Sequence, residues 1–354
     1  MIPYLLLLVA VVTTAYFGRR SGHSILRKVS LLVVGLILTL FAGLRDFRVG
    51  TDTGNYVRQF MRSESFSAAM ERRTEFGFNL LTWVARSISD SYNVMLLMIA
   101  AIVVICYVST IIKLTRRYET AIFLFIAIGI YTFFFNGARQ GIAAAICFMA
   151  IPFLLERRAA AYFTLVALGA TFHQTALIAA PLYYLASDRA GWKRVLALAL
   201  ATVIVVLFLQ VFVGFAASVL DDKYAAYAEQ GEGGGQIWVI FLVCQGVMLY
   251  MFKTAVRDPN YVRLLNIYLI GLVLALASTI SSVNPSGLLR LHLYFSSTAI
   301  VMWPMVFGQF RNTPLRGVMA LGFLAVTISF YVLTTSAFSN LVPYRASAGM
   351  FNDH

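Results

Sequence analysis

Charged residues are scarce in this chain, and acidic ones are the scarcest. Charged residues make up 12% of 354 residues, with 15 Asp and Glu against 28 Lys and Arg, whereas 60% of the residues are hydrophobic. Soluble domains carry roughly twice that charged fraction. Apolar runs of about 15 to 25 residues follow one another along the chain and leave no stretch for a soluble domain. The composition predicts an all-α polytopic membrane protein, with residues 1–354 as a single transmembrane domain.

Cysteines are few and cofactor motifs are lacking. Cys106, Cys147 and Cys244 all fall within predicted spans, where they are most simply packing residues, so no disulfide framework is expected. There is no Walker motif, no dinucleotide fingerprint and no cluster with convincing metal-ligand spacing. Asp221 and Asp222 lie in a Gly-rich loop, where such a pair is usually solvated. We therefore expect no cofactor and no metal.

Twelve membrane segments are predicted, several of them short. They are residues 2–17, 29–44, 94–114, 120–136, 139–155, 160–171, 174–186, 194–218, 237–252, 262–280, 288–308 and 316–336. The first is interpreted as a span and not a signal peptide, because no basic segment precedes it. Residues 160–186 have the length of one helix but basic flanks on both sides. We interpret them as a hairpin of two short helices that turns near His173; a single crossing would invert everything after it.

Basic clusters follow alternate spans and define the cytoplasmic side. They contain Arg19, Arg20, Arg27, Lys28, Lys113, Arg116, Arg117, Arg157, Arg158, Arg189, Lys193, Arg194, Lys253, Arg257, Arg263, Arg311 and Arg316. Against these 17 basic residues the inner face carries four acidic ones, whereas the outer face carries 11 of each sign. All the net charge is thus cytoplasmic, both termini lie outside, and the basic composition gives no reason to expect nucleic-acid binding. Ten of the 11 outer basic residues are arginines, which predicts that the outer face binds an anionic ligand.

Two outer segments are long. In residues 45–93, small and turn-forming residues from Gly50 to Asn55 are followed by a predicted amphipathic helix that carries Tyr56. Residues 75–86 are then typical of an interfacial helix or a partial span. The other segment, residues 219–236, is rich in glycine and is predicted to be flexible, either as a mobile loop over a cavity or as a plain solvated loop.

The chain resembles the EpsG family, which is similar in role to the Wzy polymerases that join oligosaccharide repeat units into exopolysaccharide, capsule or O-antigen. The motifs that carry the resemblance occur in order along nearly the whole chain. They are Arg45 with Gly50-Thr51-Asp52 and Tyr56, then Glu75, Asn136-Gly137-Ala138-Arg139-Gln140, Phe172-His173, and Pro343-Tyr344-Arg345.

The resemblance implies a glycosyltransferase in the bacterial inner membrane whose active site faces the periplasm or cell exterior. Its substrate would be an undecaprenyl-diphosphate-linked oligosaccharide, and membrane lipids would surround the protein. Its partner proteins would be a chain-length regulator and a flippase. The residues agree with such chemistry. Arginine pairs bind a diphosphate through charge-assisted hydrogen bonds and stabilise the charge that builds on it as it leaves.

Arginines on the outer side are the candidate diphosphate ligands. Arg139 begins a span beside Gln140, without an acidic neighbour in sequence, and a snorkelling anchor is the structural alternative. Arg290 lies in the first turn of a later span. For Arg45 and Arg48, which flank Asp46, a local ion-pair network competes with phosphate contact. Gln140, Tyr56 and Arg345 are further candidates for contact with the sugar or the diphosphate.

The acceptor hydroxyl needs a base. His173 lies in a short membrane segment near the outer face, and a structural histidine at a helix break is the alternative. Asp52 and Glu75 are the carboxylates that could act as base or bind sugar hydroxyls, and a solvated or Arg-paired role competes for each. His292 is interpreted as a supporting or packing residue near Arg290.

Two other functions stay open. A flippase or exporter of the same lipid-linked sugars needs polar groups through the whole depth of the membrane, and usually internal repeats. Here the ionisable residues within the spans lie toward one face, and no repeat is visible. A transferase needs only a cavity that opens outward. An O-antigen-ligase-like transferase would use the same arginines and base, and only the resemblance favours the polymerase.

Overall fold

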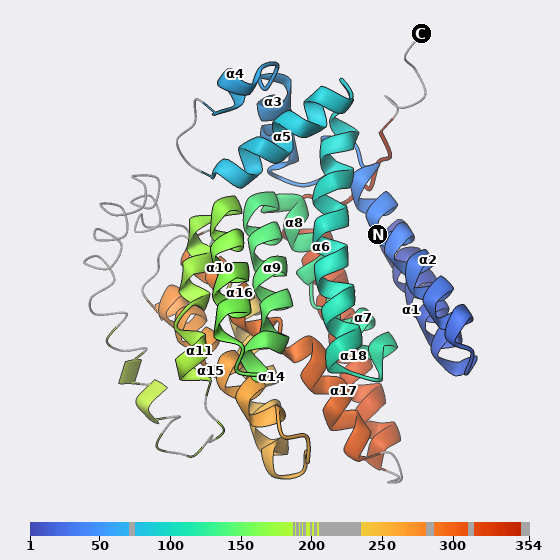
Figure 1. Ribbon diagram of the computed structural model, residues 1–354. Helices are drawn as coiled ribbons and strands as arrows, with labels where there is room; N and C mark the ends of the chain where they lie inside the picture. The colour runs from blue at the N-terminus through green and yellow to red at the C-terminus, as the bar shows by residue number, and fades with distance from the viewer. Residues whose placement is uncertain are drawn as a thin grey trace. The chain divides into compact units, whose positions relative to one another are not determined.

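The computed structural model describes residues 1–70, 75–186, 188, 191, 193, 196–198, 200–201, 204, 235–280, 287–310 and 315–347. These residues are helical and contain no strand beyond one isolated bridge, between Arg45 and Ala346. The chain divides into two compact units. Unit 1 is Met1–Pro152, Phe163–Ala176 and Phe310–His354, and unit 2 is Phe153–Tyr162 and Leu177–Gln309. The predicted all-α polytopic membrane protein is confirmed at this level (Figure 1).

The described residues contain eight helices that are long and apolar enough to span a membrane, or nine if one bent pair is a single span. They are Ile2–Arg20, Ser24–Gly43, Tyr92–Leu114, Tyr118–Asn136, Ala138–Leu155, Gln236–Thr254, Tyr261–Thr279 and Gly317–Ala337, with the bent pair Leu289–Ser296 and Ala299–Gln309. Each coincides with a predicted span. The predicted residues 160–171 and 174–186 form shorter helices, and most of 194–218 lies outside the described residues. The count of about twelve stays a prediction.

Unit 1 holds most of the helices of the first half of the chain together with the last helix. They are α1 (Ile2–Arg20), α2 (Ser24–Gly43), α3 (Thr53–Met61), α4 (Phe66–Met70), α5 (Phe76–Ile88), α6 (Tyr92–Leu114), α7 (Tyr118–Ala127), α8 (Ile130–Asn136), most of α9 (Ala138–Leu155), most of α10 (Ala159–Phe172) and α18 (Leu315–Ala337). In Figure 1, α2 lies against α1 and α6, and α3 to α5 gather at one end of α6.

Helix α2 shows how these residues produce a lipid-facing helix. Val34, Leu38 and Ala42 recur every four residues and are buried, where α2 packs on α1 and α6. Leu32 and Leu36 on the opposite side are 64% and 50% exposed. A row of exposed leucines on a long apolar helix is typical of a surface that faces lipid.

Glycines set the short connections around α8. Gly129 adopts φ 79° between α7 and α8, a conformation that other residues rarely adopt. Gly137 alone separates α8 from α9. The chain therefore passes from one membrane-spanning segment into the next within a single residue, and Arg139 lies in the first turn of α9.

The chain reverses direction at His173, as predicted from the basic flanks of residues 160–186. Helix α10 ends at Phe172, and the 3-10 helix η1 (Gln174–Ala179) and the short α11 (Leu182–Leu185) follow. The Tyr162 hydroxyl donates to the Ala179 carbonyl oxygen (2.6 Å), and the Tyr183 hydroxyl donates to that of Arg157 (2.8 Å). An earlier residue on the α10 side of His173 thus pairs with a later residue in the segment after His173, which is the pattern of an antiparallel hairpin.

Unit 2 is built around α15 (Tyr261–Ile280). It also contains α14 (Gln236–Met251), the 3-10 helices η3 (Phe252–Thr254) and η4 (Leu288–His292), α16 (Leu293–Ser296) and α17 (Ala299–Gln309). Helix α15 contacts α14, η4, α16 and α17. Two buried tyrosines of α15, Tyr261 and Tyr268, donate hydrogen bonds to α14 carbonyl oxygens, those of Leu249 and Leu242. Such bonds satisfy phenol groups that lipid could not satisfy.

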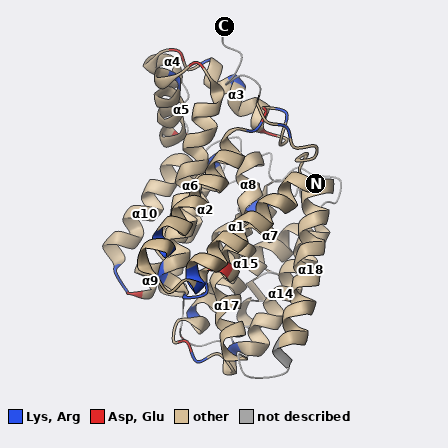
Figure 2. Cartoon of the chain, turned by 90° about the vertical axis from the view of Figure 1, so that its right-hand side faces the viewer, with Lys and Arg blue, Asp and Glu red and all other residues tan. Residues whose placement is uncertain are grey.

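Unit 1 has two polar ends. Figure 2 shows Lys and Arg gathered mainly at helix ends and connections, with the long helices uncharged over most of their length. Arg19, which was predicted to be cytoplasmic, forms an ion pair with Glu119 (2.7 Å). At the other end, residues of the predicted outer segments contact one another. Residues that hydropathy and charge assigned to opposite sides of the membrane therefore lie at opposite ends of unit 1.

Candidate functional site

The outer segment after α2 is fastened to the C-terminal tail. The Asp46 amide donates to the Arg345 carbonyl oxygen (2.9 Å), and the Gly50 amide donates to that of Asn340 (2.9 Å). The Ser347 amide donates to the Leu44 carbonyl oxygen (2.8 Å). These bonds pair residues 44–50 with residues 340–347, so the described part of the tail is held against the outer segment.

The same segment also holds the junction of α8 and α9. The Thr51 amide donates to Asn136 Oδ1 (2.6 Å), and the Ala138 amide donates to the Tyr56 hydroxyl oxygen (3.1 Å). The Thr53 hydroxyl lies 3.0 Å from the Phe135 carbonyl oxygen. The contacts bracket Gly137, so the outer segment fixes the start of the helix that carries Arg139.

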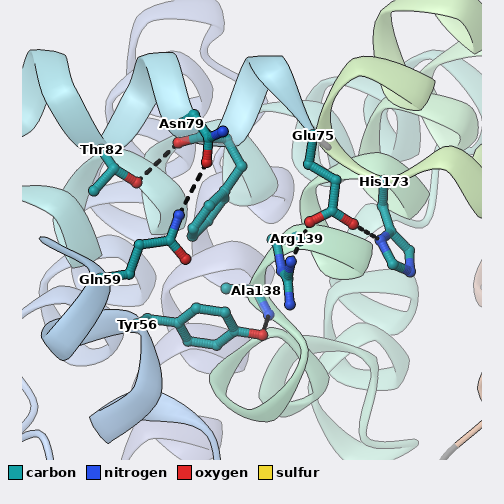
Figure 3. Close-up of polar contacts among 9 residues, drawn as sticks. Tyr56, Gln59, Glu75, Asn79, Thr82, Ala138, Arg139 and His173 are labelled. Atoms are coloured by element: carbon teal, nitrogen blue, oxygen red, sulfur yellow. Dashed lines mark hydrogen bonds and ion pairs between the residues drawn. The ribbon is translucent and has the colours of Figure 1, made fainter. Parts of the chain in front are cut away.

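Glu75 is the centre of the candidate site. It precedes α5 in a left-handed backbone conformation, φ 63°, which costs a residue with a side chain about 1 to 3 kcal/mol and is often found at functional sites. One carboxylate oxygen pairs with Arg139 Nη1, and the other lies 2.5 Å from His173 Nδ1. Figure 3 shows the carboxylate between the two side chains. Three predicted site residues, separated widely in sequence, therefore meet within unit 1.

The three side chains differ in exposure. The Glu75 side chain is 1% exposed and that of His173 is 9% exposed, whereas that of Arg139 is 35% exposed. A carboxylate beside Nδ1 favours the tautomer with a proton on Nδ1, which makes Nε2 the basic nitrogen. The cluster therefore combines a partly exposed guanidinium, suited to an anionic ligand, with an oriented imidazole, suited to proton transfer.

Residues close to Glu75 on α5, which the sequence did not single out, join α5 to α3 and to α10. The Gln59 amide nitrogen donates to Asn79 Oδ1 (3.0 Å), which joins α3 to α5 beside the site (Figure 3). A Cβ atom at Gly77 would lie 2.6 Å from Thr171 Oγ1, so α5 approaches the end of α10 closely. Asn79 lies four residues after Glu75, and so on the same face of an amphipathic helix. That spacing was the signal in the sequence that could have identified Asn79.

Arg45 is placed differently from the prediction. Its side chain is fully buried, stacks on the Phe135 ring at 4.2 Å, and donates from Nη1 to the Ala42 carbonyl oxygen at the end of α2. Burial lowers the pKa of the guanidinium to about 10, so it is still charged at neutral pH. The expected alternative of an ion pair with Asp46 is wrong as well, because Asp46 Oδ1 accepts the Arg48 amide (2.9 Å) and Arg45 Nε and Nη2 have no hydrogen-bond partner. The physical reason is that the carbonyl groups at the end of α2 and the face of the Phe135 ring present partial negative charge to the guanidinium.

Tyr56, another predicted site residue of unit 1, accepts the Ala138 amide next to Arg139. Arg48 and Arg345 are exposed, Asp52 precedes α3 and is half-buried, and Gln140 is buried next to Arg139. Their roles stay predictions.

Arg290 and His292 lie in unit 2. Arg290 is half-buried in η4, and His292 Nδ1 lies 2.8 Å from Ser296 Oγ. Most of the predicted loop 219–236, with Asp221 and Asp222, lies outside the described residues. Within the described part of the chain, no group of three or more His, Cys, Asp and Glu could hold a metal ion.

Comparisons with known proteins give one match. A model of the EpsG family matches residues 28–346 of the chain. The matched range includes Glu75, Arg139 and His173. No curated protein matches the chain. No solved structure matches it either.

Proposed function

The chain belongs to the EpsG family, and from that premise we propose that it polymerises undecaprenyl-diphosphate-linked oligosaccharide repeat units on the outer face of the bacterial inner membrane. The observation that carries the proposal is the bridge that Glu75 makes between Arg139 and His173. A cation for the diphosphate and a base for the sugar hydroxyl are the two groups that this transfer requires, and one carboxylate joins them.

Arg139 is assigned to the donor diphosphate. The guanidinium carries five N–H groups in a planar fork, so it can keep its bond to Glu75 and still donate to phosphate oxygens. Negative charge grows on the diphosphate as the glycosidic bond breaks, and a fixed cation beside it lowers the barrier. The 35% exposure of the side chain leaves a surface for that contact.

His173 is assigned as the base. The acceptor hydroxyl oxygen attacks the anomeric carbon of the donor, and its proton passes to Nε2 of His173. The bond between that carbon and the diphosphate oxygen breaks, and the lipid diphosphate leaves with the electron pair. Glu75 stabilises the imidazolium that forms and keeps the ring oriented, so it is a positioning residue for both partners.

The test is a polymerisation assay with purified protein and a lipid-diphosphate-linked repeat unit, with the products resolved as a ladder. His173→Ala is expected to lower kcat by about 10²- to 10⁴-fold, the usual contribution of a general base. Arg139→Ala is expected to lower kcat/KM by about 10²- to 10³-fold, as the loss of one transition-state donor does.

The matched control is Arg19→Ala. The Arg19 and Glu119 side chains are 34% and 11% exposed, close to the 35% and 1% of Arg139 and Glu75, but they lie at the opposite end of unit 1. This variant loses a comparable ion pair and should keep the ladder. Equal loss in Arg19→Ala and Arg139→Ala would show a folding effect only. A folded wild-type protein that moves the lipid across vesicles without a ladder would be a flippase, and one that transfers glycan to another acceptor would be a ligase.

A further inference from the structure

Asn136 contacts two segments that are far apart in the chain. Its Oδ1 accepts the Thr51 amide (2.6 Å), and its Nδ2 donates to the Ser339 carbonyl oxygen (2.9 Å). The acceptor half of the amide therefore binds the outer segment and the donor half binds the residues after α18. Asn136 is the last residue of α8, three residues before Arg139.

The outer segment is shaped for this contact. Gly50 adopts φ 98°, and a Cβ atom there would lie 2.7 Å from Asn136 Oδ1. A side chain at this position would be strained by the backbone and would also collide with the Asn136 amide. The close approach therefore requires glycine, which ties the turn before α3 to the end of α8.

We propose that Asn136 is a positioning residue for Arg139. The Asn136 amide holds the turn at Gly137 in place between the outer segment and the tail, and this sets the direction in which the Arg139 side chain projects from α9. The inference rests on the proposed function, because it assigns Arg139 to the diphosphate. Only Gly137 separates the two helices, so a rotation of the turn displaces the first turn of α9 directly. Misplacing a binding group by about 1 Å can cost on the order of 100-fold in rate.

Asn136 would make the same contacts if its role were only to stabilise the fold. A pair of double-mutant cycles distinguishes that role from positioning of Arg139. Asn136→Ala, Arg139→Ala and the double variant are compared with the wild type in full-length protein. The first readout is the Kd for undecaprenyl diphosphate in detergent, which needs no turnover. The second is the midpoint of thermal unfolding, which needs no ligand.

Asn136→Ala is expected to weaken lipid binding on the order of tenfold, and to have little further effect once Arg139 is alanine. The decreases in thermal midpoint caused by the two substitutions should also be less than additive, because an Arg139 side chain displaced by Asn136→Ala no longer pairs well with Glu75. Additive effects in both cycles would overturn the inference.

Asn93→Ala is the matched control. Asn93 is a buried amide at the same end of unit 1, whose Nδ2 donates to the Gly43 carbonyl oxygen (2.8 Å). It should lower the thermal midpoint and be additive with Arg139→Ala. If Asn136→Ala does not fold, Asn136→Ser is the substitute variant. Its side chain is polar but too short to contact both Thr51 and Ser339.

The two readouts separate this inference from the proposed function. A wild-type protein that does not bind the lipid contradicts the proposed function, and the thermal cycle alone then decides whether Asn136 acts on Arg139. Binding that depends on Arg139 but not on Asn136, with additive midpoints, would support the proposed function and contradict the positioning role.

Discussion

Two arginines of the same outer region have opposite environments. Arg45 is fully buried, with two guanidinium nitrogens that lack hydrogen-bond partners, whereas Arg139 is partly exposed and pairs with Glu75. Burying an ion costs several kcal/mol unless it is paired. The end of α2 and the Phe135 ring compensate part of that cost for Arg45, through the helix dipole and a cation–π contact. We therefore assign a structural role to Arg45, and Arg139 is the arginine that we propose for the diphosphate.

This difference predicts an unusual order of stabilities at position 45. Arg45→Met should retain a higher thermal midpoint than Arg45→Lys, because methionine fills the site without a buried charge. The lysine ammonium is more strongly hydrated than the guanidinium and cannot stack on Phe135 in the same way. The measurement is thermal unfolding of the two purified variants. A lysine variant as stable as wild type would show that the charge alone matters at this position.

The elements that carry the site meet at a close contact. Gly77, in the first turn of α5, lies against Thr171 near the end of α10, where a Cβ atom would be 2.6 Å from Thr171 Oγ1 and 3.0 Å from its carbonyl oxygen. Backbone cannot move aside as a flexible side chain can. The short distance between these helices lets Glu75 at the start of α5 reach His173 just after α10.

Gly77→Ala should therefore separate Glu75 from His173 and lower polymerisation, although alanine favours a helix more than glycine does. Gly35→Ala in α2 is the control, since nothing lies within 4 Å of its Cβ position. The assay is kcat for ladder formation beside helix content from circular dichroism. An active, folded Gly77→Ala protein would mean that the contact is not needed to hold the site.

On the scale of the whole molecule, contacts divide unit 1 into an end with the candidate site and an end with the Arg19–Glu119 pair. Lys and Arg accumulate on the cytoplasmic side of membrane proteins. The basic clusters therefore predict that the second end lies inside and the site outside.

Labelling with a membrane-impermeant maleimide tests this orientation. Cys106 and Cys147 are buried and Cys244 is exposed, so the background variant is Cys244→Ser. In intact spheroplasts, Ser65→Cys should react and Ser24→Cys should react only after permeabilisation, because these exposed positions lie at opposite ends of unit 1. The reverse pattern would place the site in the cytoplasm and contradict the proposed function.

The sequence by itself determined the membrane class, the helical fold and the family resemblance, and it included Glu75, Arg139 and His173 among the candidate residues. These follow from hydropathy, charge and motif order, which are properties of neighbouring residues. The hairpin at His173 was also predictable, because the basic flanks of residues 160–186 required both ends on one side.

Only the tertiary structure decided which carboxylate joins the site and which arginine is buried. Asp52 and Glu75 were equal candidates in sequence. Arg139 was the stronger candidate among the arginines, but nothing in the sequence indicated that Arg45 is fully buried. The contacts that distinguish the two carboxylates join residues 64 and 98 positions apart. Pairings over such distances depend on how helices pack and where glycine allows close approach, and no local pattern of residues encodes them.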